Sequence, residues 1–177
     1  ARLHTSGAPG FGRQDGRPTG HLELPNVMCR SWPEFYAHRR LQPLAKLAFD
    51  AGALPRKAIV GIERLANRID ILVGPKEPPA RLHGDLWSGN RMIDAAGRSW
   101  LVSPKAFGGD REFDLAMMRL FGGFSDACFG AYDELFPLAD GWRRRLPLYQ
   151  LAPLISHAIS SGGHYVGRVE QALLQLR

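Results

Sequence analysis

Cysteine is scarce in this chain, which has only two in 177 residues. Cys29 and Cys128 stand far apart and form no paired spacing, so the sequence favours neither a disulfide framework nor a cysteine-based metal site. Proteins without disulfides are typical of reducing compartments, and we therefore expect a cytoplasmic location.

Long hydrophobic runs are also missing. No stretch approaches the roughly 18 apolar residues of a membrane helix, and there is no signal-peptide pattern, so we expect no membrane partner. The chain is 45% hydrophobic and 23% charged, which is typical of a soluble globular protein. Its length is enough for one well-buried core, and we expect a single domain over residues 1–177.

Acidic residues are fewer than basic ones. The chain has 17 Asp and Glu but 23 Lys and Arg, which gives a formal net charge of +6. Such a charge suits a polyanionic partner, including nucleic acid, and it also suits ATP. The basic residues are dispersed, however, apart from Arg143–Arg145, and no nucleic-acid-binding motif accompanies them. We interpret that triplet as a solvated helix face and expect no nucleic-acid partner.

Several common site patterns are absent. Leu86 stands where the first glycine of a G-x-S-x-G nucleophile elbow would precede Ser88. The segment Gly10–Gly12 lacks the further glycine and lysine of a phosphate-binding loop, and the histidines outside the loop of residues 83–90 lack the i, i+4 pairing of a helical zinc site. We expect His157 and His164 to pack in the last helices or to cap them.

The first clear helix signal is a capping box, in which Ser31 precedes Glu34 by three residues. The helix that follows is predicted to bend near Pro43 and to end at Gly52. Its spacing predicts a buried face made of Leu41, Leu44, Ala48 and Ala51.

Further periodic segments indicate a mostly helical protein with a small β element. A second helix, ending near Gly74, is predicted to bury Ile59, Ile62, Ala66 and Ile69 on one stripe. A hairpin is predicted from residues 91–93 and 99–102 around a turn at 94–97. The last predicted helices cover residues 127–136, 142–161 and 165–176.

The segment His83–Asn90, with the sequence HGDLWSGN, carries the strongest chemical signal. Its Asp85 and Asn90 have the spacing with which protein kinases accept a hydroxyl proton and hold Mg²⁺. Gly84 and Gly89 let the loop turn tightly, so that both side chains can face one ligand. A D-x-x-x-x-N pattern taken alone is more often a simple turn.

The whole octapeptide resembles the catalytic loop of the fructosamine (ketosamine) kinases, a branch of the aminoglycoside and choline kinase-like phosphotransferases. The resemblance covers nearly the whole chain from Arg2 and implies the large C-terminal lobe of a protein kinase-like fold, mainly α with a small β element (α+β). Other segments similar to the family are residues 32–36, 39–41, 107–117, 120–124, 131–132, 148–151 and 162–165.

The resemblance implies a reaction, two cofactors and a small-molecule partner. ATP would donate its γ-phosphoryl group to the 3-hydroxyl of a ketoamine formed by glycation, which is a deglycation step. Asp85 would orient that hydroxyl and accept its proton, and Asn90 would bind Mg²⁺ against the phosphates. His83 is predicted to be a structural hydrogen-bonding group of the loop, whereas Trp87 either stacks on the sugar adduct or packs.

The chain departs from the family pattern at two points. Ser103 stands where the family has an aspartate that is the second Mg²⁺ ligand, and Lys105 adds a positive charge nearby. A neutral hydroxyl is a weak ligand for Mg²⁺. In addition, no segment of these 177 residues is similar to the small nucleotide-binding lobe of the family. We therefore expect this chain alone to lack kinase activity. The alternative function is that of a catalytically inactive fragment or pseudokinase-like remnant that acts as a binding module.

Two acidic residues after the hairpin have open roles. Asp114 stands at the opening of an apolar helix, where it can cap the helix and, in kinase-like folds, anchor the catalytic loop. Glu112 can belong to the same network or lie on the surface.

Overall fold

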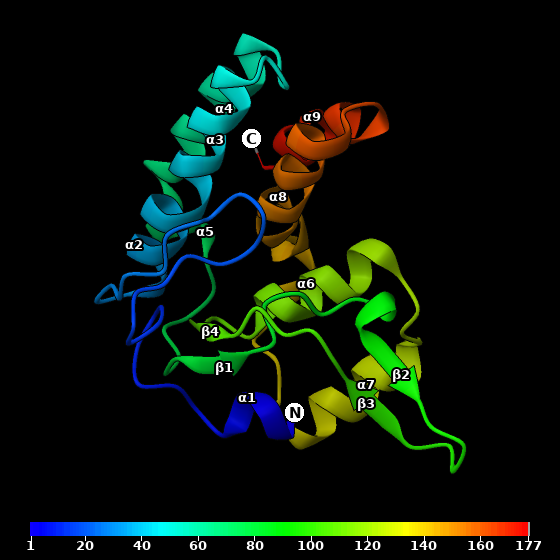
Figure 1. Ribbon diagram of the computed structural model, residues 1–177. Helices are drawn as coiled ribbons and strands as arrows, with labels where there is room; N and C mark the ends of the chain where they lie inside the picture. The colour runs from blue at the N-terminus through cyan, green and yellow to red at the C-terminus, as the bar shows by residue number, and fades with distance from the viewer. Residues whose placement is uncertain (177) are drawn as a thin grey trace.

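Helices dominate the computed structural model, which describes residues 1–176 (Figure 1). Arg177, the last residue of the predicted domain, lies outside the described residues. The predicted fold class, mainly α with a small β element, is confirmed. The α-helices are α1 (Arg2–Thr5), α2 (Trp32–Tyr36), α3 (Gln42–Asp50), α4 (Arg56–Ala66), α5 (Ile69–Leu72), α6 (Glu112–Phe121), α7 (Asp126–Leu135), α8 (Trp142–Ser161) and α9 (His164–Gln175).

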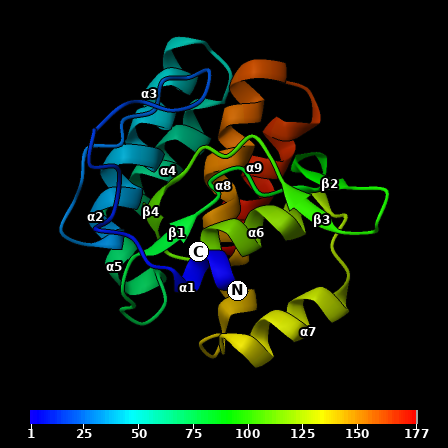
Figure 2. The ribbon, with the colours of Figure 1, turned by 60° about the horizontal axis from the view of Figure 1, so that its bottom comes forward.

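The strands form two small antiparallel sheets. In the first, β1 (Ala80–Leu82) pairs with β4 (Phe107–Gly109), with Leu82 opposite Phe107. In the second, β2 (Arg91–Ile93) pairs with β3 (Ser99–Leu101), with Arg91 opposite Leu101. The predicted hairpin is therefore present. It projects from the body of the molecule in both ribbon views (Figures 1 and 2).

The capping box at the start of α2 forms as predicted, except that the Glu34 carboxylate accepts the N–H of Arg30 and not that of Ser31. The Ser31 hydroxyl accepts the Glu34 N–H at 3.3 Å, and the Glu34 carboxylate accepts the N–H of Arg30 at 3.0 Å. Between α2 and α3 the chain forms a π-helical turn, Ala37–Leu41. Pro43 follows this turn and has no N–H to donate to the carbonyl four residues back, which is the kind of break that the predicted bend requires.

Two details of the predicted helices are wrong. Ala51 is exposed, because α3 ends at Asp50 and residue 51 is its cap. The second predicted helix is two helices, since Arg68 leaves helical geometry and separates α4 from α5. Its predicted stripe is nevertheless buried, as are the other members of the first stripe.

Buried apolar side chains form two clusters that meet along α6 and α8. The larger cluster joins α2, α3, α4, α6, α8 and α9 and includes Phe35, Leu44 and Leu151. The smaller one joins the 83–90 loop, α6, α7 and the first residue of α8, and it includes Leu115 and Phe129. Burying such a side chain contributes about 1.5–3 kcal/mol. Because α6 and α8 contribute to both clusters, they fix the loop against the helical body. Within residues 1–176, no helix has the length and apolar character that crossing a bilayer requires.

Candidate functional site

The 83–90 loop leaves β1 and lies directly beside residues 102–105. The Lys105 N–H donates to the His83 carbonyl at 2.9 Å, and the Val102 N–H donates to the Asn90 carbonyl at 3.0 Å. Gly84 has a φ of +78°, and a Cβ at this position would overlap the Lys105 carbonyl oxygen. Glycine is therefore required for both the turn and the close approach of the two segments.

The fully buried Asp114 carboxylate anchors the 83–90 loop through hydrogen bonds to its backbone. It accepts the N–H groups of His83, at 2.6 Å, and of Gly84, at 2.9 Å. It also contacts His4 Nε2 at 3.1 Å, while His4 Nδ1 lies 2.7 Å from the Tyr132 hydroxyl. This anchoring role was one of the two open predictions. The other, a helix cap, is wrong, because the N-cap of α6 is residue 111.

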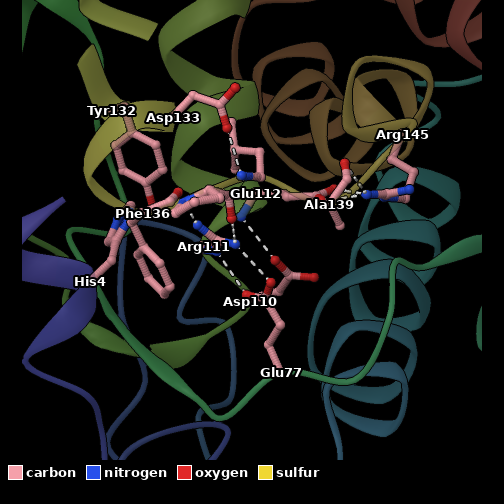
Figure 3. Close-up of polar contacts among 12 residues, drawn as sticks. His4, Glu77, Asp110, Arg111, Glu112, Tyr132, Asp133, Phe136, Ala139 and Arg145 are labelled. Carbon is pink, nitrogen blue, oxygen red and sulfur yellow. Dashed lines mark hydrogen bonds and ion pairs between the residues drawn. The ribbon is translucent and has the colours of Figure 1, made fainter. Parts of the chain in front are cut away.

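Ion pairs surround the start of α6 (Figure 3). Arg111 donates two hydrogen bonds to Glu77, both 2.7 Å, and Arg145 donates two to Glu112, at 2.8 and 2.6 Å. Glu112 is buried, so its alternative surface role is wrong. Arg145 is also half-buried, which corrects the prediction that Arg143–Arg145 form a solvated face; only residues 143 and 144 are exposed.

A cavity of about 420 Å³ opens beside the loop, and Asp85 is the only carboxylate among the described residues that line it. Its Oδ2 lies 2.8 Å from the Lys105 ammonium. The cavity walls come from the loop before α2, the 83–90 loop, α6, α8 and α9. The lining residues are Thr19, Gly20, His21, Leu22, Leu24, Arg40, Gly84, Asp85, Trp87, Lys105, Phe107, Phe113, Met117, Phe121, Ala152, Pro153, Ser156, His157 and Tyr165.

The predicted metal-binding residues lie on adjacent segments. The Asn90 side-chain nitrogen donates to the Asp85 carbonyl at 2.8 Å, which leaves its Oδ1 as the group that can face a ligand. Ser103 follows Val102 and is exposed, with a left-handed φ of +55°. The hairpin therefore returns position 103 beside Asn90, as expected. Their roles in metal binding stay predictions.

The residues at this position do not match the donor set of Mg²⁺. They offer one amide oxygen and one hydroxyl, and Asp85 is paired with Lys105. Mg²⁺ is usually bound through one or two carboxylates plus substrate phosphates. Among residues 1–176, moreover, no group of three or more His, Cys, Asp or Glu side chains is placed to hold a metal ion. A metal at this site would need ligands from outside these residues.

The histidines near the cavity are structural in their contacts. His83 is buried, and its Nε2 donates to the Val102 carbonyl at 3.0 Å, because a carbonyl can only accept. Its Nδ1 then accepts the Asp85 N–H at 3.3 Å, which agrees with its predicted role. His157 stacks on Tyr165 with ring centroids 4.8 Å apart, and burial lowers the pKa of His157.

Sequence reasoning missed the ion pair of Asp85 and the buried partner of Asp114. Lys105 was noted only for its charge, and no contact was predicted for His4. The positive charge of Lys105, two residues after Ser103, was a usable signal. No local pattern pointed to His4, because its partners come from α6 and α7.

Comparison with known proteins places this chain in a family. Residues 1–177 match the fructosamine kinase family. A probable ketoamine kinase of Enterococcus faecium is 38% identical over 98% of this chain and 63% of its own length, and mouse ketosamine-3-kinase is 36% identical over 84% and 48%.

A solved structure also matches. A Thermobifida fusca protein, provisionally named a fructosamine-3-kinase, superposes with a TM-score of 0.89 at 41% identity, over 97% of this chain and 60% of that one. The chain thus spans about three fifths of the length of the first relatives it matches. With the 83–90 loop, the kinase-like lobe and the family match in agreement, the chain belongs to the fructosamine kinase family.

Proposed function

We propose that residues 1–177 form the acceptor-binding lobe of a kinase that phosphorylates a sugar hydroxyl of ketoamines. The observation that carries the proposal is the position of Asp85, whose carboxylate faces a cavity of about 420 Å³ from an anchored loop. That volume lies in the range of small-molecule sites, about 300–1,000 Å³, and aromatic rings suited to a sugar face line it. A ketoamine is therefore the substrate class that the cavity and the family together favour.

In the proposed reaction the hydroxyl oxygen forms a bond to the γ-phosphorus of ATP, and the bond from that phosphorus to the bridging oxygen breaks. The products are a phosphorylated ketoamine and ADP. Asp85 accepts the hydroxyl proton, and Asp114 keeps Asp85 in place by holding the backbone of residues 83 and 84. In such reactions most of the rate comes from positioning and charge stabilisation. Phosphorylation of the sugar makes the reaction a deglycation step.

ATP and Mg²⁺ are the cofactors that this proposal implies. Asn90 Oδ1 is the amide oxygen that would face the metal, and the Ser103 hydroxyl would add a weak neutral ligand. Phosphate oxygens and residues beyond this chain would complete the set. We therefore assign no step to the metal here.

A second function, a ketoamine-binding protein without turnover, is favoured by one specific contact. Lys105 pairs directly with Asp85 at 2.8 Å, and Ser103 replaces the acid expected nearby. Both features weaken a kinase site and leave the cavity intact.

One experiment separates the two functions. The chain is joined to the part of the E. faecium relative that lies outside the matched region, and transfer of labelled phosphate from ATP to a 1-deoxyketosyl amine is measured. We expect transfer that Asp85→Asn reduces by a factor of at least about 100. The matched control is Asp50→Asn, which removes a surface carboxylate paired with Lys46. Binding of the ketoamine without transfer would instead establish the binding protein, and transfer that survives in Asp85→Asn would refute the assigned base.

A further inference from the structure

The cavity carries more positive than negative charge. Asp85, the single carboxylate among the lining residues that the structure describes, is already paired with Lys105, and the guanidinium of Arg40 also lines the cavity. His21 and His157 also line the cavity and add no negative charge. Even without any charge on the two imidazoles, the described lining residues carry one cation in excess.

Arg40 is a buried cation without an acidic partner among the described residues. Its guanidinium donates only to neutral acceptors, the Asn26 side-chain oxygen at 2.6 Å and the carbonyls of Pro25 and Arg39, both at 2.8 Å. Burial lowers the pKa of Arg40 to about 9, so the group stays charged at neutral pH.

Aromatic rings on both sides help to tolerate this charge. The Arg40 guanidinium carbon lies 4.6 Å from the ring centre of Phe35 and 4.5 Å from that of Phe107, distances at which a ring face attracts a cation. These contacts do not cancel the positive field. Because the neighbouring walls are largely apolar, that field is less screened in the cavity than in water.

Lys105 is the accessible cation of the cavity. Its side chain is 44% exposed, whereas Arg40 is only 3% exposed. Its backbone is held against the 83–90 loop by the bond to His83, so the start of the side chain is fixed. An ammonium has three N–H donors, and one of them serves Asp85. The others can bind a ligand without breaking that pair.

We propose that the acceptor bound in this cavity carries an anionic group, a carboxylate or a phosphate, which Lys105 binds. Lys105 is then a specificity-determining residue that bridges the ligand anion and Asp85. Without the bridging ammonium, the ligand anion and the Asp85 carboxylate would repel each other. The nature of the acceptor as a ketoamine rests on the proposed function, but the preference for an anion does not.

The test is calorimetric titration of the 177-residue chain at low salt with matched ligands. One pair is the 1-deoxyketose adduct of glycine and that of glycinamide, which differ in a carboxylate on the amine side. The other pair is the adduct of methylamine with and without a phosphate on the sugar. We expect the anionic member of at least one pair to bind roughly five- to tenfold more tightly, as one charge-assisted contact at a half-exposed site provides. The pair that shows the difference identifies the source of the anion.

Lys105→Met should reduce that preference to less than about twofold. Lys46→Met is the matched control, because Lys46 also pairs with a carboxylate, at 2.6 Å, but is exposed on α3 and does not line the cavity. Equal affinities within both pairs, no binding by any ligand, or a preference that survives Lys105→Met would each overturn the proposal. The binding titration does not depend on phosphoryl transfer, so its result can be interpreted even if the kinase assay shows no activity.

Discussion

His4 and Asp114 are 110 residues apart in sequence, and their side chains meet at 3.1 Å in the interior. The same His4 ring reaches the Tyr132 hydroxyl on its other side at 2.7 Å. Asp114 in turn accepts two backbone N–H groups of the 83–90 loop. The helices α1, α6 and α7 are therefore joined to the loop through one carboxylate.

Asp114→Asn should destabilise the fold and loosen the loop. An amide has only one oxygen, so one loop N–H loses its acceptor and faces an NH₂ group instead. We expect the free energy of unfolding to fall by about 2–4 kcal/mol, measured by urea denaturation. Hydrogen exchange at the His83 and Gly84 amides should become faster.

The control for this substitution is Asp126→Asn. Asp126 pairs with Arg119 at 2.7 Å but is 88% exposed, so its loss should change stability by less than about 0.5 kcal/mol. Unchanged protection of the two loop amides in Asp114→Asn would show that another group holds the loop.

Local patterns were enough to predict most helices and the loop. The capping box at Ser31, the apolar stripe of α4 and the turn at residues 94–97 all depend on neighbours within a few positions, which the sequence displays directly. The errors in the predicted helices concern only where a helix ends or is interrupted. The break at Arg68 interrupts a stripe that stays apolar on both sides, so periodicity alone does not reveal it.

The contacts that build the site could not be predicted in the same way. Lys105 reaches Asp85, and Glu112 reaches Arg145, only after the sheets and helices have packed. No spacing rule connects residues 20 or 33 positions apart. The resemblance to a family identified the loop, but it gave no partner for the Asp85 carboxylate, because Lys105 belongs to another segment, which the chain brings beside the loop only when it folds.

Asp110 should make stability depend on pH. Loss of hydration, together with the nearby Glu112 carboxylate, raises the pKa of Asp110 to about 6, although the Tyr149 hydroxyl donates to it at 2.7 Å. An unfolded chain releases this proton near pH 3.9. Between about pH 4 and 6 the folded state therefore holds more protons than the unfolded state, and stability falls as pH rises through that window.

The difference in stability between the parent and Asp110→Asn isolates this effect, because the amide does not titrate. The contributions of the other carboxylates are the same in both proteins and cancel in the difference. The variant should gain stability relative to the parent between pH 4.5 and 7, by on the order of 2 kcal/mol. Urea denaturation at both pH values measures the difference. A stability difference that stays the same at both pH values would mean that Asp110 is ionised throughout.

Alanine substitutions at Gly84 and Gly97 test how tightly the 83–90 loop packs against residue 105. Their φ angles are +78° and +77°, but a Cβ on Gly97 meets nothing within 4 Å, whereas one on Gly84 overlaps the Lys105 carbonyl. Gly97→Ala should lower the free energy of unfolding by about 1 kcal/mol, the cost of a left-handed alanine. Gly84→Ala should lower it by roughly 3 kcal/mol, because overpacking adds to that cost. Equal losses in denaturation experiments would mean that the two segments separate easily.

The β2–β3 hairpin has apolar side chains on both faces. Successive strand residues point to opposite faces, and Met92 and Ile93 are both exposed, as are Trp100 and Leu101 on the paired strand. Within residues 1–176, these four side chains are covered only in part. Exposed apolar patches of this kind promote association, so we expect the 177-residue chain to self-associate as its concentration rises.

Light scattering after size-exclusion chromatography measures this association, and a matched pair of substitutions locates it. Ile93 and Ile71 are 62% and 72% exposed, but Ile71 lies on α5, away from the hairpin. Both lysine variants add the same charge. Ile93→Lys should shift the chain toward monomer, because a charged side chain is expensive to bury in an apolar contact, whereas Ile71→Lys should leave the association unchanged. A monomer at all concentrations, or equal effects of the two variants, would mean that the hairpin is not the contact surface.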